Sequence, residues 1–269
     1  MGTDRLIRRA APAVVCLFVA ACGGSGSSSS STAASTSTTT APAATTTVGA
    51  PDDETTTTAP ESQADPDALA EAKVRAALAM LPDTWQGSVA SDLGEEGAGD
   101  DIVFAPCLGP DDYDLDNLDA DSAASWELDA EGPSTGSPIG GQQATVEARV
   151  FAEGADVDSA FAVLEYVLGT DEGRACLAAE VPGQLAAGAP PDAEFDASVE
   201  GPAVEGAQVG ARLVVGFNAG GISGEFYIDL VASRVDERCT VFATFMGFGE
   251  PVDPAVASAM FDAAVTAEL

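Results

Sequence analysis

Three strand-like segments follow one another in the last quarter of the chain, separated only by short turns. They cover residues 208–218, 224–233 and 238–247 and are rich in Val, Ile, Phe and Tyr, which favour strands. The turn between the first two contains Asn218 and a Gly-Gly pair, which suits a tight reversal. Consecutive strands joined in this way pair antiparallel. These segments therefore predict an antiparallel sheet.

Further strand patterns precede these segments. Trp126 and Leu128 alternate with charged residues, and residues 142–152 alternate between small apolar and polar side chains. Residues 194–200 also read as a strand, and a short apolar run at 102–105 suggests another. The sheet is therefore expected to contain more than the three C-terminal strands.

Helices are expected where an N-cap residue precedes an apolar stripe with helical spacing. Asp65, Asp156 and Asp253 stand at such positions, and the first and last of them are each followed by a proline, which fits a first helical position. A further turn of helix is expected after Thr170. The sequence predicts an α+β fold with a single mostly antiparallel sheet and helices packed on one face, in one domain over residues 65–269.

The charge of the chain excludes several classes of function. It has 44 acidic and 10 basic residues and no histidine, for a net charge of -34. Such a protein repels phosphate backbones and anionic lipid headgroups, so we expect no nucleic-acid partner. Without histidine it lacks the Ser-His and Cys-His nucleophile pairs and most zinc and haem sites. No cofactor is expected, and charge repulsion favours a monomer.

The N-terminus has the features of an export signal with a lipidation site. Three arginines within the first nine residues precede an apolar run at 10–21, which is too short for a permanent membrane span. The run ends in small residues before Cys22, and here the sequence resembles the bacterial lipobox, whose cysteine becomes the acylated N-terminus after cleavage. We expect residues 1–21 to be removed and Cys22 to carry a lipid such as palmitate. An ordinary secretory signal with an incidental cysteine is the alternative.

Residues 22–64 are dominated by Ser, Thr, Ala and Pro and have no hydrophobic periodicity. They cannot bury enough apolar surface to offset the entropy of ordering, so we expect a disordered stalk between the lipid and the domain. The expected location is extracytoplasmic, in the cell envelope, with the membrane contacted only through the N-terminal lipid.

Residues 66–269 resemble a known family in their pattern. An opening helix leads to Leu-Pro-Asp-Thr-Trp at 81–85, a cysteine follows a short strand, and a helix runs from Ser159 to Cys176 before the strand-rich half. Together with the lipobox and stalk, this is similar to secreted actinobacterial lipoproteins. Their domain looks like the extracellular sensor domain of PknH-type kinases and, more distantly, like the PsbP-like fold of LpqN-type lipoproteins. This chain departs from the kinase sensors in lacking a kinase domain or transmembrane helix and in having three domain cysteines. The resemblance implies a module that binds or senses something in the cell envelope.

The three domain cysteines lie in a compartment that permits disulfides. Cys107 and Cys176 are favoured as the bonded pair because both lie at irregular ends of elements. Cys239 alternates with Val241 and Ala243 in a strand, which favours a small buried side chain over a reactive thiol. A different pairing of the three is the alternative.

Two motifs match known sites only in part. Asp112, Asp114 and Asp116 have the spacing that opens a calcium loop, but the glycine and glutamate positions of such a loop are not kept. A solvated acidic loop is favoured there, and no metal is expected. Residues 132–136 spell G-x-S-x-G, but they lie in a Gly- and Pro-rich loop of a chain without histidine, so they do not indicate a catalytic serine.

An apolar ligand is expected on the concave side of the sheet near the turn at 218–224, because aromatic residues cluster in the longest strands. Plain core packing is the alternative for these aromatics. Two arginines on the strands could converge on an anionic group or pair with nearby carboxylates. The candidate ligand-binding residues are Phe217, Phe226, Tyr227, Phe242, Arg149 and Arg212.

The sequence therefore predicts a non-enzymatic binding or sensing domain on a surface lipoprotein, with an unidentified envelope ligand or partner. Two alternatives stay open. One is a histidine-independent hydrolase of wall glycans that would use carboxylates such as Glu147, Glu225 and Asp229. The other is a structural envelope protein.

Overall fold

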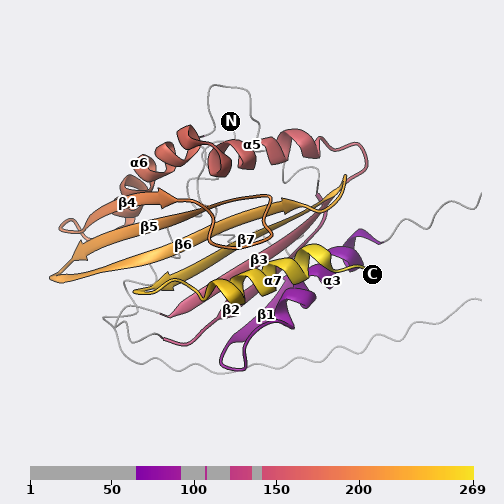
Figure 1. Ribbon diagram of the computed structural model, residues 1–269, viewed down its shortest axis with the longest axis horizontal. Coiled ribbons are helices and arrows are strands. Elements are labelled where there is room, and N and C mark those ends of the chain that lie inside the picture. The colour runs from indigo at the N-terminus through magenta and orange to yellow at the C-terminus, as the bar shows by residue number, and fades with distance from the viewer. Residues whose placement is uncertain (1–64, 92–106, 108–121, 135–140) are drawn as a thin grey trace, which may run out of the picture. The chain divides into compact units, whose positions relative to one another are not determined.

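The computed structural model describes residues 65–91, 107, 122–134 and 141–269. Seven strands form one sheet in the order β1-β2-β3-β7-β6-β5-β4, and every neighbouring pair is antiparallel (Figure 1). This confirms the expected α+β class and antiparallel sheet. The strands are β1 (Gln86–Ser91), β2 (Ser122–Glu131), β3 (Gln142–Phe151), β4 (Glu194–Glu200), β5 (Val209–Ala219), β6 (Ile222–Arg234) and β7 (Cys239–Phe248).

The described helices begin at the residues that the sequence indicated. The Asp65 carboxylate accepts a hydrogen bond from the Asp67 amide at 3.1 Å, and Asp253 accepts one from the Ala255 amide at 2.9 Å. Thr170 caps the third helix, which is 18 residues long rather than the single turn expected. The helices are α3 (Pro66–Leu78), α5 (Val157–Gly169), α6 (Asp171–Gly188) and α7 (Pro254–Thr266).

Helices lie on both faces of the sheet, so the expectation of one covered face is wrong. Val146 lies opposite Ala243 and Ala243 opposite Val231, which places the three on the same face. Leu230 is the next residue along β6 and lies opposite Ala211, so this pair points to the other face. Side chains of α3 and α7 pack with the first group and side chains of α5 and α6 with the second.

The strand order explains why the second face needs its own helices. β3 and β4 are consecutive strands, but β7, β6 and β5 lie between them in the sheet. The connection through α5 and α6 therefore crosses the sheet to its far edge and covers the β4–β5 half of the second face (Figure 1). Meanwhile α3 and α7 cover the β2–β3–β7 part of the first face.

Each covered half has a separate apolar core. The first core, under α3 and α7, contains the fully buried side chains of Leu128, Phe245, Met260 and Phe261. The second core, under α5 and α6, contains Leu168, Leu177, Leu213 and Leu230, which are also fully buried. β6 contributes to both cores because it lies near the middle of the sheet, and neighbouring residues along it face opposite ways.

Two glycines form the turn of the hairpin between β5 and β6. Gly220 and Gly221 form a two-residue turn between β5 and β6, with φ values of 59° and 82° that favour glycine.

β1 was not expected from the sequence. The expected strand at 102–105 and the calcium candidates Asp112, Asp114 and Asp116 lie outside the described residues. No helix in the described ranges is long and apolar enough to span a membrane.

Candidate functional site

The aromatic residues predicted to bind a ligand do not form one site. Phe217 and Phe226 lie in the second core with Phe248, and the ring centroids are 6.3 Å apart for Phe217–Phe226 and 5.7 Å for Phe226–Phe248. Phe242 packs against the same core. Tyr227 follows Phe226 along β6 and therefore lies on the opposite face. The rings at 217 and 226 are core packing, the alternative that the sequence left open.

The two candidate arginines lie on opposite faces and each binds a carboxylate. Arg149 Nη2 lies 2.6 Å from Glu147 Oε1, and Ser125 Oγ donates to the same oxygen at 3.0 Å. Arg212 donates to Asp229 from Nε and Nη2, at 2.8 Å and 2.7 Å. The hydrogen bonds that Arg212 donates to Asp229 raise the pKa of Arg212 above its ordinary value. The arginines therefore do not converge on a ligand.

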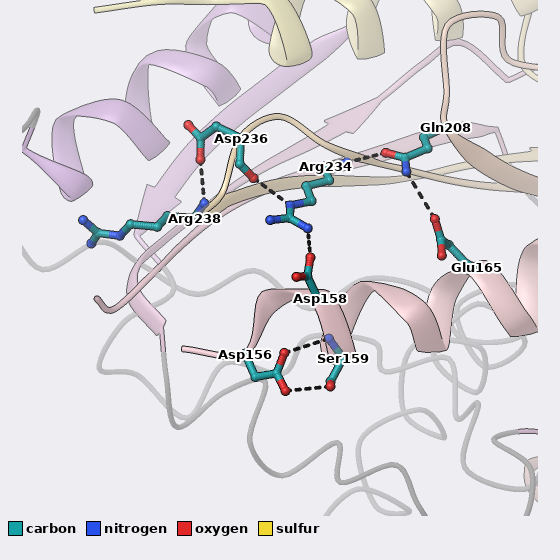
Figure 2. Close-up of polar contacts among 8 residues, drawn as sticks. All are labelled: Asp156, Asp158, Ser159, Glu165, Gln208, Arg234, Asp236 and Arg238. Atoms are coloured by element: carbon teal, nitrogen blue, oxygen red, sulfur yellow. Dashed lines mark hydrogen bonds and ion pairs between the residues drawn. The ribbon is translucent and has the colours of Figure 1, made fainter. Parts of the chain in front are cut away.

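A polar network at the start of α5 holds two further arginines (Figure 2). Arg234 pairs with Asp158 in the first turn of α5 and donates from Nε to the Asp236 carbonyl at 2.9 Å. Gln208 accepts from the Arg234 amide at 3.3 Å and donates to Glu165 of α5 at 3.2 Å (Figure 2). These bonds attach α5 to the ends of β5 and β6.

Further polar contacts lie beside this network, at Asp156 before α5 and at Arg238 before β7 (Figure 2). The Asp156 carboxylate accepts from the amide and hydroxyl of Ser159, at 3.1 Å and 2.7 Å, and these hydrogen bonds lower the pKa of Asp156. The Arg238 amide donates to Asp236 at 2.7 Å, and Arg238 Nε donates to the Phe151 carbonyl at 2.9 Å. The network is therefore structural: it caps α5 and closes the β6–β7 turn.

All seven basic side chains from residue 65 onward have a partner within the domain. Lys73 is 1% exposed and donates to the carbonyls of Ala264, Val265 and Ala267 at the end of α7. Arg174 donates to the carbonyls of Gly169 and Thr170. The others are Arg75, Arg149, Arg212, Arg234 and Arg238.

The structure joins Cys107 to Cys176, the pair that the sequence favoured, with Cα atoms 5.6 Å apart. Cys239 is free and fully buried in the first core, and burial raises its pKa to about 12. Within the described ranges, no three cysteine or carboxylate side chains lie close enough to hold a metal ion. The described part of the G-x-S-x-G segment lies between β2 and β3, and the next described element is the strand β3, whereas a nucleophile elbow leads into a helix.

A cleft lies between the first half of α6 and the end of β4. Its volume is about 280 Å³, and it is partly open to solvent. Apolar side chains of both elements line it together with charged side chains. The lining residues are Asp171, Arg174, Ala175, Ala178, Val199, Glu200 and Gly201. We name this feature the β4–α6 cleft.

β4 is the last strand of the sheet and lies beside α6 (Figure 1). Its residues alternate strictly, with Phe195, Ala197 and Val199 half-buried toward the second core and the residues between them exposed. Sequence reasoning identified β4 as a strand but missed the cleft. The alternation was visible in the sequence, but the position of β4 at the sheet edge was not.

No family model matches the chain, and no curated protein matches it at a significant level. The solved structure of an uncharacterised Mycobacterium smegmatis protein, described as an ortholog of Rv0999, is similar over 76% of this chain and 99% of that chain. The identity is 14% and the TM-score is 0.39.

Proposed function

We propose that this protein is a surface-anchored lipoprotein whose domain binds an envelope ligand or partner. The anchor is supported by the export signal, by Cys22 and by the Ser/Thr-rich stalk that leads to Asp65. The Cys107–Cys176 disulfide is compatible with a domain outside the cytoplasm. The resemblance to sensor-bearing actinobacterial lipoproteins supports the same proposal.

The β4–α6 cleft is the observation that carries the binding function. It places apolar side chains and charged groups side by side at an edge of the sheet, where a partner can contact both. The carboxylates considered for hydrolysis have structural partners instead: Glu147 binds Arg149, Asp229 binds Arg212, and Glu225 accepts from the Tyr227 hydroxyl at 2.8 Å. These pairs favour binding over hydrolysis.

The binding function is tested by filling the cleft. Ala178 lines the cleft, whereas Ala179 is exposed on the same helix and does not line it. Ala178→Trp and Ala179→Trp are each combined with Cys22→Ser, which removes the proposed lipid, and these variants and Cys22→Ser alone are mixed with the cell-envelope fraction of the source organism and sedimented. We expect Ala178→Trp to lose retention about fivefold or more, with Ala179→Trp close to Cys22→Ser alone. Equal retention of the two variants would count against binding in this cleft.

The anchor is tested separately. A Cys22→Ser variant should lose acyl labelling and leave the membrane fraction, because cleavage and acylation at the lipobox require the cysteine thiol. A variant that stays membrane-bound and labelled would contradict the lipoprotein assignment without affecting the cleft.

A further inference from the structure

We propose that the β4–α6 cleft binds an extended polypeptide segment of a partner, which pairs with β4 as an eighth strand and alternates basic and apolar residues. This rests on the proposed binding function and names the kind of partner that the cleft takes.

β4 forms one edge of the described sheet. β4 pairs with β5 along its whole length, and no other described strand pairs with its outer side. An edge strand presents a row of backbone N–H and C=O groups to an incoming strand. Proteins that bind peptides by strand addition use such an edge, with pockets beside it for alternate side chains. The β4–α6 cleft lies beside this edge.

The apolar row of β4 is only partly covered near the cleft. Ala197 and Val199 point toward the second core but are half-buried, unlike the buried row on β5. Alternate side chains of an added strand would continue this row. Ala175 and Ala178 leave the space beside Val199 that such an apolar side chain would fill. Burial of apolar surface on both sides would favour the pairing.

The other face of β4 is acidic. Glu194, Asp196 and Glu200 are exposed on the other face of β4. Glu194 and Asp196 form no ion pair with another described residue. All seven basic side chains of the domain bind other groups of the domain. We therefore expect a cation that pairs with Glu194 and Asp196 to come from another molecule. Basic side chains at every second position of an added strand would lie next to them.

Carboxylates on an edge strand also have a protective role, because they discourage pairing with other chains. Protection alone predicts that no strand adds, whatever its sequence. Charge attraction alone predicts that any basic peptide binds. The proposal differs from both because it requires a particular alternation and a particular set of backbone N–H groups.

The experiment titrates the full-length protein with synthetic peptides of about nine residues, long enough to pair along a strand. The probes are a peptide that alternates lysine and valine, one with the same composition in two blocks, and one that alternates glutamate and valine. Two further versions of the first peptide carry N-methyl groups, which remove N–H donors, on either the odd or the even residues. We expect only the alternating lysine peptide to bind, and one N-methylated version to lose affinity about tenfold or more while the other keeps it.

Equal binding of both N-methylated versions, or of the block peptide, would overturn strand addition. Absence of binding by every peptide would overturn it as well. The charge argument is tested with Glu194→Lys/Asp196→Lys, for which we expect about tenfold weaker binding. Its matched control is Asp129→Lys/Glu131→Lys, which reverses two exposed carboxylates on β2 and should bind as wild type.

The two proposals fail in distinguishable ways. If Ala178→Trp abolishes envelope retention but the peptides show no preference, the cleft binds something other than a strand. If Ala178→Trp has no effect on retention, the binding function assigned to the cleft fails, and strand addition there fails with it. Melting temperatures of all variants separate loss of binding from loss of folding.

Discussion

Arg212 and Asp229 form a two-point ion pair between neighbouring strands, with Nε 2.8 Å from Oδ1 and Nη2 2.7 Å from Oδ2. Asp229 is 1% exposed and lies opposite the fully buried Phe245 on β7. The pair therefore lies at the border of the first core, where removal of Arg212 leaves the buried Asp229 without its counter-charge and removal of Asp229 leaves a partly buried Arg212 without one.

Replacement of Asp229 by alanine should be strongly destabilising. We expect Asp229→Ala to lower the free energy of unfolding by about 3 kcal/mol, because a partly buried Arg212 then loses both hydrogen bonds to its counter-charge. Urea denaturation measures this change. The double variant Arg212→Met/Asp229→Leu should recover most of the loss, since it buries no charge; a double variant as unstable as Asp229→Ala would contradict this explanation.

Lys73 joins the first helix of the domain to the last one. Its ammonium group lies 3.1–3.4 Å from three carbonyl oxygens at the end of α7, where the helix dipole is negative. We expect Lys73→Met to cost about 2 kcal/mol and to increase amide exchange in the last turn of α7. Arg75→Met is the matched control: this side chain is 57% exposed and pairs only with Glu71, so its loss should cost less than about 0.5 kcal/mol.

Gly173 is required by the close approach of α5 and α6. A Cβ at this position would lie 2.6 Å from Val167 Cα and closer still to the Tyr166 carbonyl oxygen. Gly173→Ala should therefore lower stability by about 2 kcal/mol. Gly183→Ala on the same helix meets no atom within 4 Å and should be neutral or slightly stabilising. Similar melting temperatures for the two variants would show that the helix contact is not tight.

The Cys107–Cys176 disulfide closes a segment with a sequence separation of 69 residues. A closed loop of this length restricts the unfolded chain and thereby raises the free energy of unfolding by about 4 kcal/mol. Reduction should therefore lower the melting temperature markedly, and Cys107→Ala/Cys176→Ala should reproduce the reduced value. Cys239→Ala should keep the sensitivity to reductant; its loss in that variant would place Cys239 in the bridge.

Cys239 should be unreactive in the folded protein. Because burial raises its pKa from 9.0 to about 12, the thiol stays protonated at pH 8 and should be alkylated only after denaturation. Peptide mapping after alkylation under native and denaturing conditions measures this.

The same pKa shift predicts a fall in stability at alkaline pH. Between pH 9 and about 12 the unfolded thiol releases its proton while the folded one keeps it, so stability decreases as pH rises. Ionisation of this thiol in the unfolded chain lowers the free energy of unfolding by up to about 1.4 kcal/mol per pH unit. Cys239→Ala should show a shallower loss of stability over this window, and an unchanged slope would mean that other groups dominate.

The elements were largely predictable because their signals are local. The alternation over 142–152 marks β3, and the Asp-Pro pairs at 65 and 253 mark the starts of α3 and α7. Periodicity also predicted that Cys239 is buried. β1 was missed because Gln86–Ser91 contains only one larger apolar residue, and its pairing with β2 makes it a strand.

The candidate site was not predictable in the same way. The aromatic rings at 217, 226 and 227 looked like one cluster in the sequence, but neighbouring residues on a strand face opposite ways. The alternation of β4 was visible, but its place at the end of the described sheet depends on strand order. Strand order is decided by contacts between residues far apart in the chain, for which no local pattern exists.

The sequence by itself therefore determined the types and the approximate limits of most strands and helices, the α+β class and the burial of Cys239, because periodicity and capping act over a few residues. Only the tertiary structure decided that helices cover both faces, that Lys73 closes α3 onto α7, and that β4 ends the sheet beside a cleft. The insertion of β7, β6 and β5 between β3 and β4 is the physical reason. It sends α5 and α6 across the second face to the edge and so creates the proposed binding site.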